Sequence, residues 1–373
     1  AVQFRKLSYD EITSRLQNLH SRYPGDTRLF SAQSRYSLAS PGTCGANPCE
    51  QMILVIAANG TAPQSLPQVF FSGAVHGDER VGPTTVVELA TLLLQHLHDP
   101  DGNVWLKRLA STREIWLLPM TNALGYYNNE RGEHGIDPNR DFSYNVDTCF
   151  RSVTAQTVNE MFRENAFETA ITFHGGMEAI AYVWGSVNHV ENDASPDDAA
   201  HAATASVLRD FAGTAEGRTY MAGRMNDIVY EVNGGMEDWA YAASWENAYT
   251  TPAPIRGCTT ANGYDTSRTR DYPDASARAL IFLVETSNNK SPPDATLGST
   301  KDLLLPASPD ADGHVARNIR LALALLDLTR PYVTFTDATV CSDTPSHARR
   351  RRLLQVPIGE DLGGQLAVTA DWA

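Results

Sequence analysis

The sequence lacks the signatures of several familiar protein classes. Its longest apolar runs, such as residues 53–58, are too short to span a bilayer as a helix. No two of its five cysteines form a CxxC pair, which argues against a cysteine zinc knuckle. Neither a GxSxG elbow nor an HExxH motif occurs. We therefore expect no membrane span, no nucleophilic serine hydrolase and no zincin.

Positive charge is scarce as well. Lys and Arg number 30 against 44 Asp and Glu, which gives a formal net charge of −14 at pH 7. Binding to nucleic acids without sequence preference depends on an excess of basic side chains, so we expect no nucleic-acid partner. Hydrophobic residues make up 42% of the 373 residues, which suffices for a large globular core.

The cysteines and two glycosylation sequons bear on the compartment. Cys44 and Cys49 are close enough in a Gly/Pro/Asn loop to form a small disulfide, and the other three cysteines leave one unpaired. Residues 59–61 (NGT) and 289–291 (NKS) match the N-glycosylation sequon. Disulfides and sequons are typical of oxidising compartments, so we expect a secreted or vacuolar protein.

Apolar segments that suit strands alternate with segments that suit helices. Strands are predicted at 52–58, 68–75, 115–120, 169–173 and 279–284, and helices at 7–23, 81–98, 153–164, 199–211 and 315–328. Residues 122–145 read as a long polar loop of the kind that often carries function. Because several strands are apolar throughout, we predict an α/β fold with a mixed, mainly parallel twisted sheet and helices on both faces.

Three polar residues follow the ends of predicted strands: His76, His174 and Glu285. In open α/β sheets, ligands bind at this edge. His76 and Glu79, three residues apart at a strand-to-helix turn, can aim an imidazole and a carboxylate at one point, and His174 supplies a third ligand. This set suits a catalytic zinc ion. The alternatives are a surface histidine followed by a helix-starting glutamate, and an ordinary buried histidine.

The loop at residues 132–142 (GEHGIDPNRDF) provides a second signal. Asn139 and Arg140 together offer a fork of donors with a positive charge, which matches a carboxylate. Arg131 lies eight residues before Asn139. The alternative is an ordinary turn with a solvated arginine.

Five segments, in this order, resemble the zinc metallocarboxypeptidases related to pancreatic carboxypeptidases A and B. They are residues 73–79 (GAVHGDE), 135–142 (GIDPNRDF), 173–176 (FHGG), 233–241 (NGGMEDWAY) and 282–285 (FLVE). The HGG and GGMxD pieces are most similar to the carboxypeptidase N/E branch. The resemblance spans roughly residues 5–330 and implies that fold and a zinc-dependent carboxypeptidase activity.

The resemblance also implies roles for individual residues. His76, Glu79 and His174 would hold one Zn²⁺ per chain. Glu285 would act as general base toward a zinc-activated water, and Arg131 would stabilise the developing oxyanion.

Two further roles concern the substrate. Asn139 and Arg140 would bind the C-terminal carboxylate of a peptide or protein. Tyr241 would close over the substrate from a mobile loop, the alternative being a core aromatic beside Trp239.

Specificity and domain organisation depart from the resemblance. The N/E branch carries an acidic specificity residue about 11 positions after the HGG histidine, where this chain has Gly185. Asp265, Asp271 or Asp274 could replace that charge. We expect residues 1–330 to form the catalytic domain, and residues 331–373 a tail that could be a truncated transthyretin-like β segment.

We thus expect a monomeric metallocarboxypeptidase that hydrolyses the C-terminal peptide bond of peptides or proteins. Two rivals remain open. An aspartoacylase-like zinc amidohydrolase shares the HxxE, Asn-Arg and later-His pattern. A non-catalytic binding protein could retain the fold, although such relatives commonly lose the base or a metal ligand.

Overall fold

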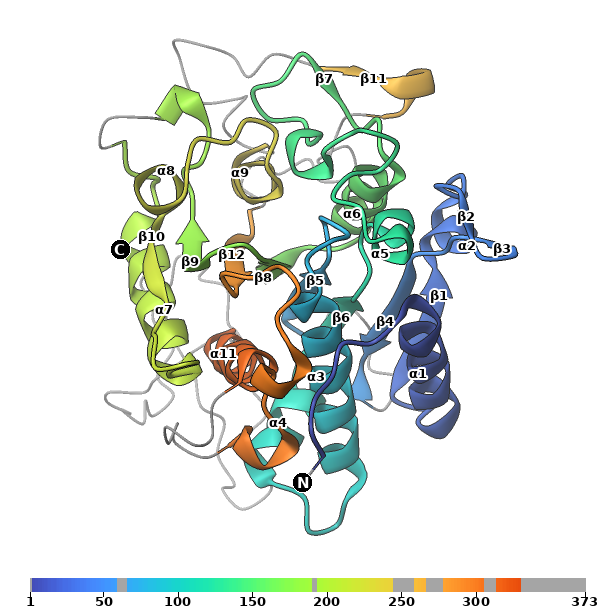
Figure 1. Ribbon diagram of the computed structural model, residues 1–373, viewed down its shortest axis with the longest axis vertical. Coiled ribbons are helices and arrows are strands. Elements are labelled where there is room, and N and C mark those ends of the chain that lie inside the picture. Colours follow the sequence, from blue (N-terminus) through green and yellow to red (C-terminus); the bar gives the residue numbers. More distant parts are fainter. Residues whose placement is uncertain are drawn as a thin grey trace, which may run out of the picture. The chain divides into compact units, whose positions relative to one another are not determined.

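A mixed sheet of eight strands forms the centre of the fold. The computed structural model describes residues 2–58, 66–189, 193–243, 258–265, 278–304 and 313–329. The strands of the large sheet follow the order β1-β4-β6-β5-β8-β12-β9-β10 (Figure 1). They are β1 (Thr27–Ser31), β4 (Met52–Ile56), β5 (Gln68–Gly73), β6 (Glu114–Leu118), β8 (Phe167–His174), β9 (Glu178–Tyr182), β10 (Met221–Arg224) and β12 (Leu280–Thr286). Two small ribbons pair β2 (Thr43–Cys44) with β3 (Asn47–Pro48), and β7 (Thr148–Cys149) with β11 (Thr259–Thr260).

Pairing is parallel at the centre of the large sheet and mixed toward its edges. β6, β5, β8 and β12 are neighbours and run parallel to one another. β4 pairs antiparallel with both β1 and β6, and β9 pairs antiparallel with β12. The predicted α/β class with a mixed sheet is confirmed, and the central parallel strands bring their carboxyl ends to one edge.

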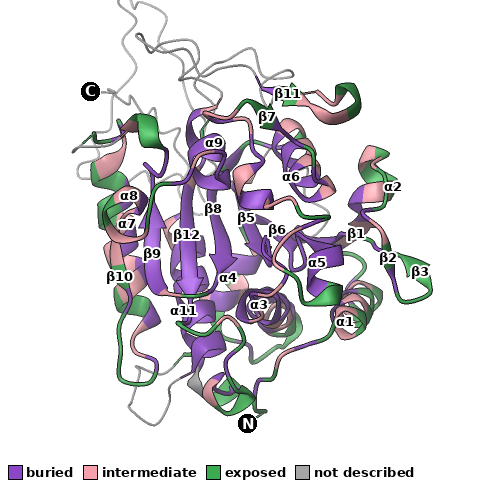
Figure 2. Cartoon of the chain, turned by 45° about the horizontal axis from the view of Figure 1, so that its top comes forward, coloured by how far each residue is buried: buried purple, intermediate pink, exposed green. Residues whose placement is uncertain are grey.

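Helices cover both faces of the sheet, as predicted (Figure 2). One hydrophobic cluster joins the sheet to α1, α3, α4, α7 and α11, and a second joins it to α6 and α9. The helices are α1 (Tyr9–Arg22), α2 (Ala32–Tyr36), α3 (Val81–His98), α4 (Val104–Ser111), α5 (Ala123–Asn128), α6 (Val153–Glu164), α7 (Asp198–Ala212), α8 (Met225–Ile228), α9 (Met236–Ala242) and α11 (His314–Leu328).

The all-apolar strands are explained by these two clusters. In β4, Leu54 and Ile56 belong to the first cluster, whereas Ile53 and Val55 belong to the second. Successive side chains of a strand point to opposite faces, so a strand covered on both sides must be apolar at every position.

Most predicted elements are present, with one clear exception. Helices at 81–98 and 153–164 have the predicted bounds. Residues 122–145, predicted as a loop, contain α5 and the short 3₁₀ helix Pro138–Arg140. Asn122 starts α5 by accepting a hydrogen bond from the backbone N–H of Gly125. A helix of only six residues gives too short a pattern to be recognised in the sequence.

Two disulfides close the loops around the fold. Cys44 and Cys49 are bonded, which confirms the predicted small loop. Cys149 in β7 is bonded to Cys258, 109 residues further along the chain. The remaining cysteine, Cys341, and the predicted tail at 331–373 lie outside the described residues.

No helix in the described part of the chain has the length and apolarity needed to cross a membrane.

Candidate active site

Three neighbouring strands carry the site to one edge of the sheet. β8 lies between β5 and β12, and His174 at the end of β8 pairs directly with Glu285 of β12. Gly73 at the end of β5 pairs with Phe173, so His76 follows at the same edge. Thr286 fixes the strand ends because its hydroxyl donates to the carbonyl of His174 at 2.7 Å.

The turn after β5 depends on close backbone packing. A Cβ atom at Gly73 would lie 2.6 Å from the carbonyl oxygen of Pro119 and 2.8 Å from the nitrogen of Pro83. Any other residue would push this turn away from β6 and from the start of α3. Gly73 therefore lets the chain turn directly into His76 and Glu79, just before α3 begins.

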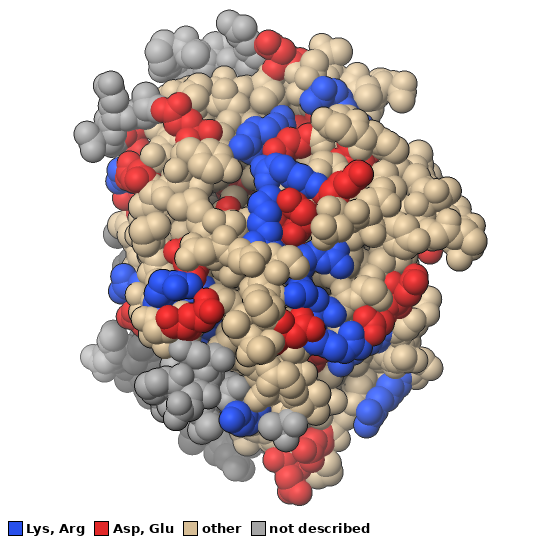
Figure 3. Space-filling model, viewed as in Figure 1, with Lys and Arg blue, Asp and Glu red and all other residues tan. Residues whose placement is uncertain are grey.

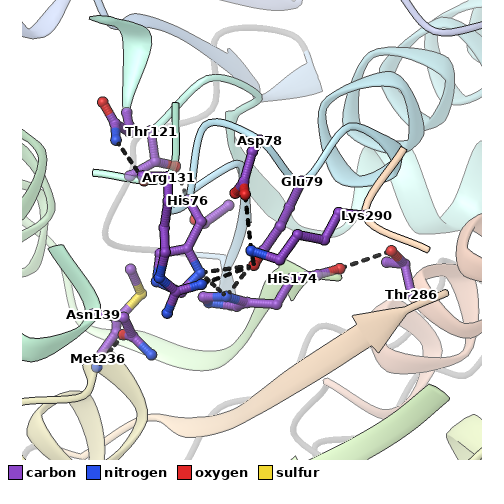
Figure 4. A network of polar contacts seen from close by, with 12 residues as sticks. His76, Asp78, Glu79, Thr121, Arg131, Asn139, His174, Met236, Thr286 and Lys290 are labelled. Atoms are coloured by element: carbon purple, nitrogen blue, oxygen red, sulfur yellow. Dashed lines mark hydrogen bonds and ion pairs between the residues drawn. The ribbon is translucent and has the colours of Figure 1, made fainter. Parts of the chain in front are cut away.

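His76, Glu79 and His174 converge on one point (Figure 4). His76 Nδ1 lies 2.9 Å from Glu79 Oε1, and His174 Nδ1 lies 3.1 Å from Glu79 Oε2. The two Nδ1 atoms are 3.1 Å apart. All three side chains are buried, with 2–3% of each residue exposed.

A partly exposed carboxylate from the loop orients the ring of His76. Asp137 Oδ1 lies 2.9 Å from His76 Nε2. A proton on Nε2 shared with this carboxylate leaves the lone pair of Nδ1 facing Glu79 and His174, which is the usual arrangement around a metal-binding histidine. Burial opposes the charged imidazole, but the carboxylates of Glu79 and Asp137 outweigh it and raise the pKa of His76. The site thus attracts a cation.

The three residues fit a zinc ion. A tetrahedral zinc with ligand bonds of about 2.0 Å separates neighbouring donor atoms by about 3.3 Å, close to the distances above. Glu79 Oε2, although buried, has no hydrogen-bond partner among the described residues. Two imidazoles and one carboxylate are a common ligand set of catalytic zinc.

Glu285 lies beside this cluster, because it pairs with His174 across neighbouring strands. Glu285 is only 7% exposed, and its Oε2 has no hydrogen-bond partner in the described part of the chain. Burial raises the pKa of the Glu285 carboxyl, partly offset by His174. The backbone N–H of Met177 also binds this carboxylate, which leaves Oε2 as the oxygen that is open to a ligand. A desolvated carboxylate with one open oxygen is suited to accept a proton.

Arg131 reaches the metal cluster from the loop after α5. Its Nη1 lies 3.4 Å from Glu79 Oε1, while Nε and Nη2 donate to Asp137 Oδ2 at 3.1 and 2.9 Å. The guanidinium keeps 37% of its side-chain surface exposed. A fixed positive charge is therefore available to a ligand at the metal.

Asn139 and Arg140 follow on the same loop. Asn139 Oδ1 accepts from the backbone N–H of Met236 at 2.9 Å, which leaves Nδ2 as the group that can donate to a ligand. Arg140 is half-buried, donates to the carbonyl of Asn139 at 2.7 Å, and lies 5.8 Å from the ring centre of Tyr230. The predicted carboxylate-binding pair is thus brought next to the predicted metal ligands.

Two buried carboxylates attach this loop to the first turn of α6. Glu133 accepts from the backbone N–H groups of Val153 and Thr154 at 2.6 and 3.0 Å. Asp141 accepts from the backbone N–H and the hydroxyl of Ser152 at 2.7 and 2.8 Å. The segment that carries Arg131, Asn139 and Arg140 is held at both ends by one helix terminus.

Tyr241 does not occupy the mobile loop that the sequence suggested. It lies in α9 and is fully buried, and its hydroxyl donates to Asp197 Oδ2 at 2.8 Å. Its ring packs edge-on against Trp184 and His201. The structure corrects this expectation: Tyr241 is the core aromatic that was the alternative.

Two residues near the loop escaped the sequence reasoning. Tyr230 is 49% exposed beside Arg140, so its position is that of a side chain that can move over a ligand. Glu237, the second residue of α9, is fully buried, with Oε2 3.5 Å from Asn139 Nδ2 and Oε1 without a partner among the described residues. Both belong to the segment 230–241, of which the sequence motif singled out only Tyr241.

The structure describes one of the three suggested substitutes for the missing acidic residue. Asp265 Oδ2 lies 3.6 Å from Arg163 of α6. Asp271 and Asp274 lie outside the described residues. Gly185 instead donates its backbone N–H to Asp238, which also accepts from Ser186.

Basic side chains gather on the face that Figure 3 presents. They run down its middle, next to acidic side chains, although the whole chain carries an excess of negative charge. A candidate metal site of two histidines and one glutamate with two adjacent arginines, at the edge of a mixed α/β sheet, is the arrangement of a metal-dependent hydrolase.

Comparison with known sequences identifies the family. The model of the zinc carboxypeptidase family matches residues 47–261, more than half of the chain. The chain belongs to this family of metallocarboxypeptidase hydrolases. It is 24% identical to carboxypeptidase B of Astacus astacus over 62% of this chain and 80% of that protein. It is also 24% identical to carboxypeptidase D of Mus musculus over 70% of this chain, but this spans only 22% of that protein.

Solved structures share the fold. A crystal structure of thrombin activatable fibrinolysis inhibitor matches with a TM-score of 0.61 and 12% identity, covering 87% of this chain and 74% of that one. Carboxypeptidase A from Helicoverpa armigera matches with a TM-score of 0.58 and 14% identity over the same shares. These likenesses support the mixed α/β architecture.

Proposed function

We propose that the protein is a zinc-dependent exopeptidase that removes single residues from the C-termini of peptides. The observation that carries this proposal is the convergence of His76, Glu79 and His174 beside the carboxylate of Glu285, whose Oε2 has no hydrogen-bond partner among the described residues. A zinc ion held there would polarise the scissile carbonyl and lower the pKa of water. One ion per chain satisfies the site.

Four side chains of the protein carry out proton transfer, oxyanion stabilisation and substrate binding. Glu285 accepts the proton of the attacking water and passes it to the leaving amine. Arg131 donates to the carbonyl oxygen as negative charge develops on it. Asn139 Nδ2 and the Arg140 guanidinium bind the terminal carboxylate of the substrate, and this explains why an internal peptide bond is not a substrate.

A blocked dipeptide with a free C-terminus tests this function. We expect hydrolysis that stops on addition of a chelator, returns with zinc, and falls about 10–100-fold on the C-terminally amidated substrate. The amide removes the charge that Arg140 pairs with, and such pairs contribute about 1.5–3 kcal/mol. Equal rates on both substrates, or activity that survives the chelator, would contradict the proposal.

The two rivals predict other results in the same assay. An aspartoacylase-like amidohydrolase would cleave an acyl-amino acid and leave the longer peptide intact. A binding protein would bind the peptide without cleaving it. The open Oε2 of Glu285 favours catalysis over mere binding, since a binding site needs no proton acceptor beside the metal.

We further propose that the terminal residue of the substrate is basic. Glu237 is a buried carboxylate beside the Asn139 amide, and Oε1 lacks a partner in the described part of the chain. A Cβ at Gly235 would lie 2.2 Å from Oε1, so only glycine there lets the side chain fold back into this position. A lysine or arginine side chain supplies the hydrogen bonds that a buried carboxylate requires.

The isosteric variant Glu237→Gln measures this preference. We expect kcat/KM for a Lys- or Arg-terminated peptide to fall about 10–100-fold, the cost of a charged hydrogen bond. The rate on a Leu-terminated peptide should stay within about threefold. Burial raises the pKa of the Glu237 carboxyl, so the preference for basic residues should increase with pH as that group ionises.

Two results would contradict the proposed specificity. One is a wild-type preference for Leu, Phe or Glu termini. The other is an equal loss on all substrates in Glu237→Gln, since that would indicate a structural role for the carboxyl.

We also propose a secretory or vacuolar location, and a monomer as the functional unit. The two disulfides support the location because such bonds persist in oxidising compartments.

A further inference from the structure

Lys290 is a charged residue at the metal site to which the proposed reaction assigns no role. Its Nζ lies 2.9 Å from Asp78 Oδ2 and 3.3 Å from Glu79 Oε1 (Figure 4). Only 34% of its side-chain surface is exposed. A lysine side chain next to two carboxylates is an ammonium at neutral pH.

The two oxygens of the Glu79 carboxylate have different surroundings. Oε1 lies 2.9 Å from His76 Nδ1, 3.3 Å from the ammonium of Lys290 and 3.4 Å from the guanidinium of Arg131. Oε2 lies 3.1 Å from His174 Nδ1 and makes no hydrogen bond in the described part of the chain. Both cationic side chains thus contact Oε1.

Lys290 itself is fixed by its surroundings. Its carbonyl accepts from the backbone N–H of Arg80 at 2.7 Å, which ties it to the start of α3. Its side chain crosses Gly176, where an added Cβ would lie 3.7 Å from Lys290 Cε. Lys290 lies in the segment that follows β12, the strand that carries Glu285. Its contacts therefore connect the end of β12 to the turn that carries Glu79.

We propose that Lys290 is a positioning residue that orients Glu79 for zinc binding. The lysine fixes one oxygen of Glu79 and thereby reduces the conformational freedom that the ligand loses when the ion binds. The contact with Asp78 balances the lysine charge, so the ammonium adds little net repulsion toward the ion. Partners that hold a metal ligand from outside typically change metal affinity 10–100-fold. This inference rests on the proposed metal site, not on the identity of the substrate.

Zinc affinity tests the proposal directly. Apo protein is titrated with zinc against a competing chelator for the wild type, Lys290→Met and Lys290→Arg. We expect the Kd of Lys290→Met to rise about tenfold or more, with Lys290→Arg closer to wild type because it keeps the charge. The unfolding temperature of the apo protein is recorded for each variant, so that a general loss of stability is separated from a loss of zinc affinity.

Lys6→Met is the matched control. Lys6 contacts the same chain segment, since its Nζ lies 3.3 Å from Asp294 Oδ1, but it pairs with no metal ligand. The proposal is overturned if Lys290→Met binds zinc within twofold of wild type, binds it more tightly, or weakens it no more than Lys6→Met does. A wild-type protein that binds no zinc would instead contradict the proposed function.

Discussion

Replacing Glu285 with glutamine should lower kcat by about 10³-fold, while zinc remains bound. General base catalysis typically contributes 10²–10⁴-fold, and an amide of the same shape cannot accept the proton of the attacking water. The change corresponds to about 4 kcal/mol of barrier. Because Glu285 is not a metal ligand, KM and zinc content should change little.

The same variant gives a test of pH dependence. Burial raises the pKa of Glu285, so the wild-type rate should fall at acidic pH above the ordinary range of a glutamate, as the base becomes protonated. In Glu285→Gln the residual rate should lose this acidic limb. A kcat within tenfold of wild type, or an unchanged acidic limb, would contradict the role of general base.

Replacing His174 with alanine should abolish activity and zinc binding together. His174 is one of the three candidate ligands found among the described residues, and its Nδ1 is the atom that faces both His76 and Glu79. We expect zinc affinity to fall by at least about 100-fold, beyond the 10–100-fold range of groups that only support a ligand. Zinc content after dialysis, measured by elemental analysis, is the readout.

His96→Ala serves as the control for His174→Ala. His96 lies in the last turn of α3 and accepts a hydrogen bond from the backbone N–H of Asn103 at 3.1 Å, away from the metal cluster. This variant should keep zinc and activity. If His174→Ala retains one zinc per chain at wild-type affinity, the proposed ligand set is wrong.

The sequence predicted the metal cluster because its geometry follows from strand ends. His174 and Glu285 terminate adjacent parallel strands, so two apolar runs and the residue after each were enough to bring them together. His76 and Glu79 depend only on a short local spacing. These positions are set by local pattern and sheet topology, which a single sequence expresses well.

Other parts of the site depend on tertiary contacts that have no local signature. Glu237 and Asp238 look alike in the sequence, as two acidic residues in the first turn of a helix. In the structure, Asp238 accepts backbone hydrogen bonds from Gly185 and Ser186, whereas Oε1 of Glu237 has no partner among the described residues. The contacts of residues 185 and 186 with Asp238 therefore distinguish this structural carboxylate from that of Glu237, which we propose binds the substrate.

The two tyrosines of segment 230–241 show the same difficulty. Tyr241 carries the resemblance, but it is buried and its hydroxyl binds Asp197. Asp197 lies 44 residues earlier in the chain, so the motif gives no sign of this contact. Tyr230 lies outside the recognised pattern and remains exposed beside Arg140. Burial of an aromatic residue in a short helix is decided by what packs on it, so its role could not be read from the motif.

The attachment of residues 131–141 to the first turn of α6 matters for protein engineering. A designer who transplants this segment into another scaffold must also transfer the helix turn that receives Glu133 and Asp141. Without that turn, Arg131 and Arg140 would not be held in the positions that they have here. Libraries aimed at new substrates should keep these two acids constant, because their contacts with residues 152–154 hold the segment in place.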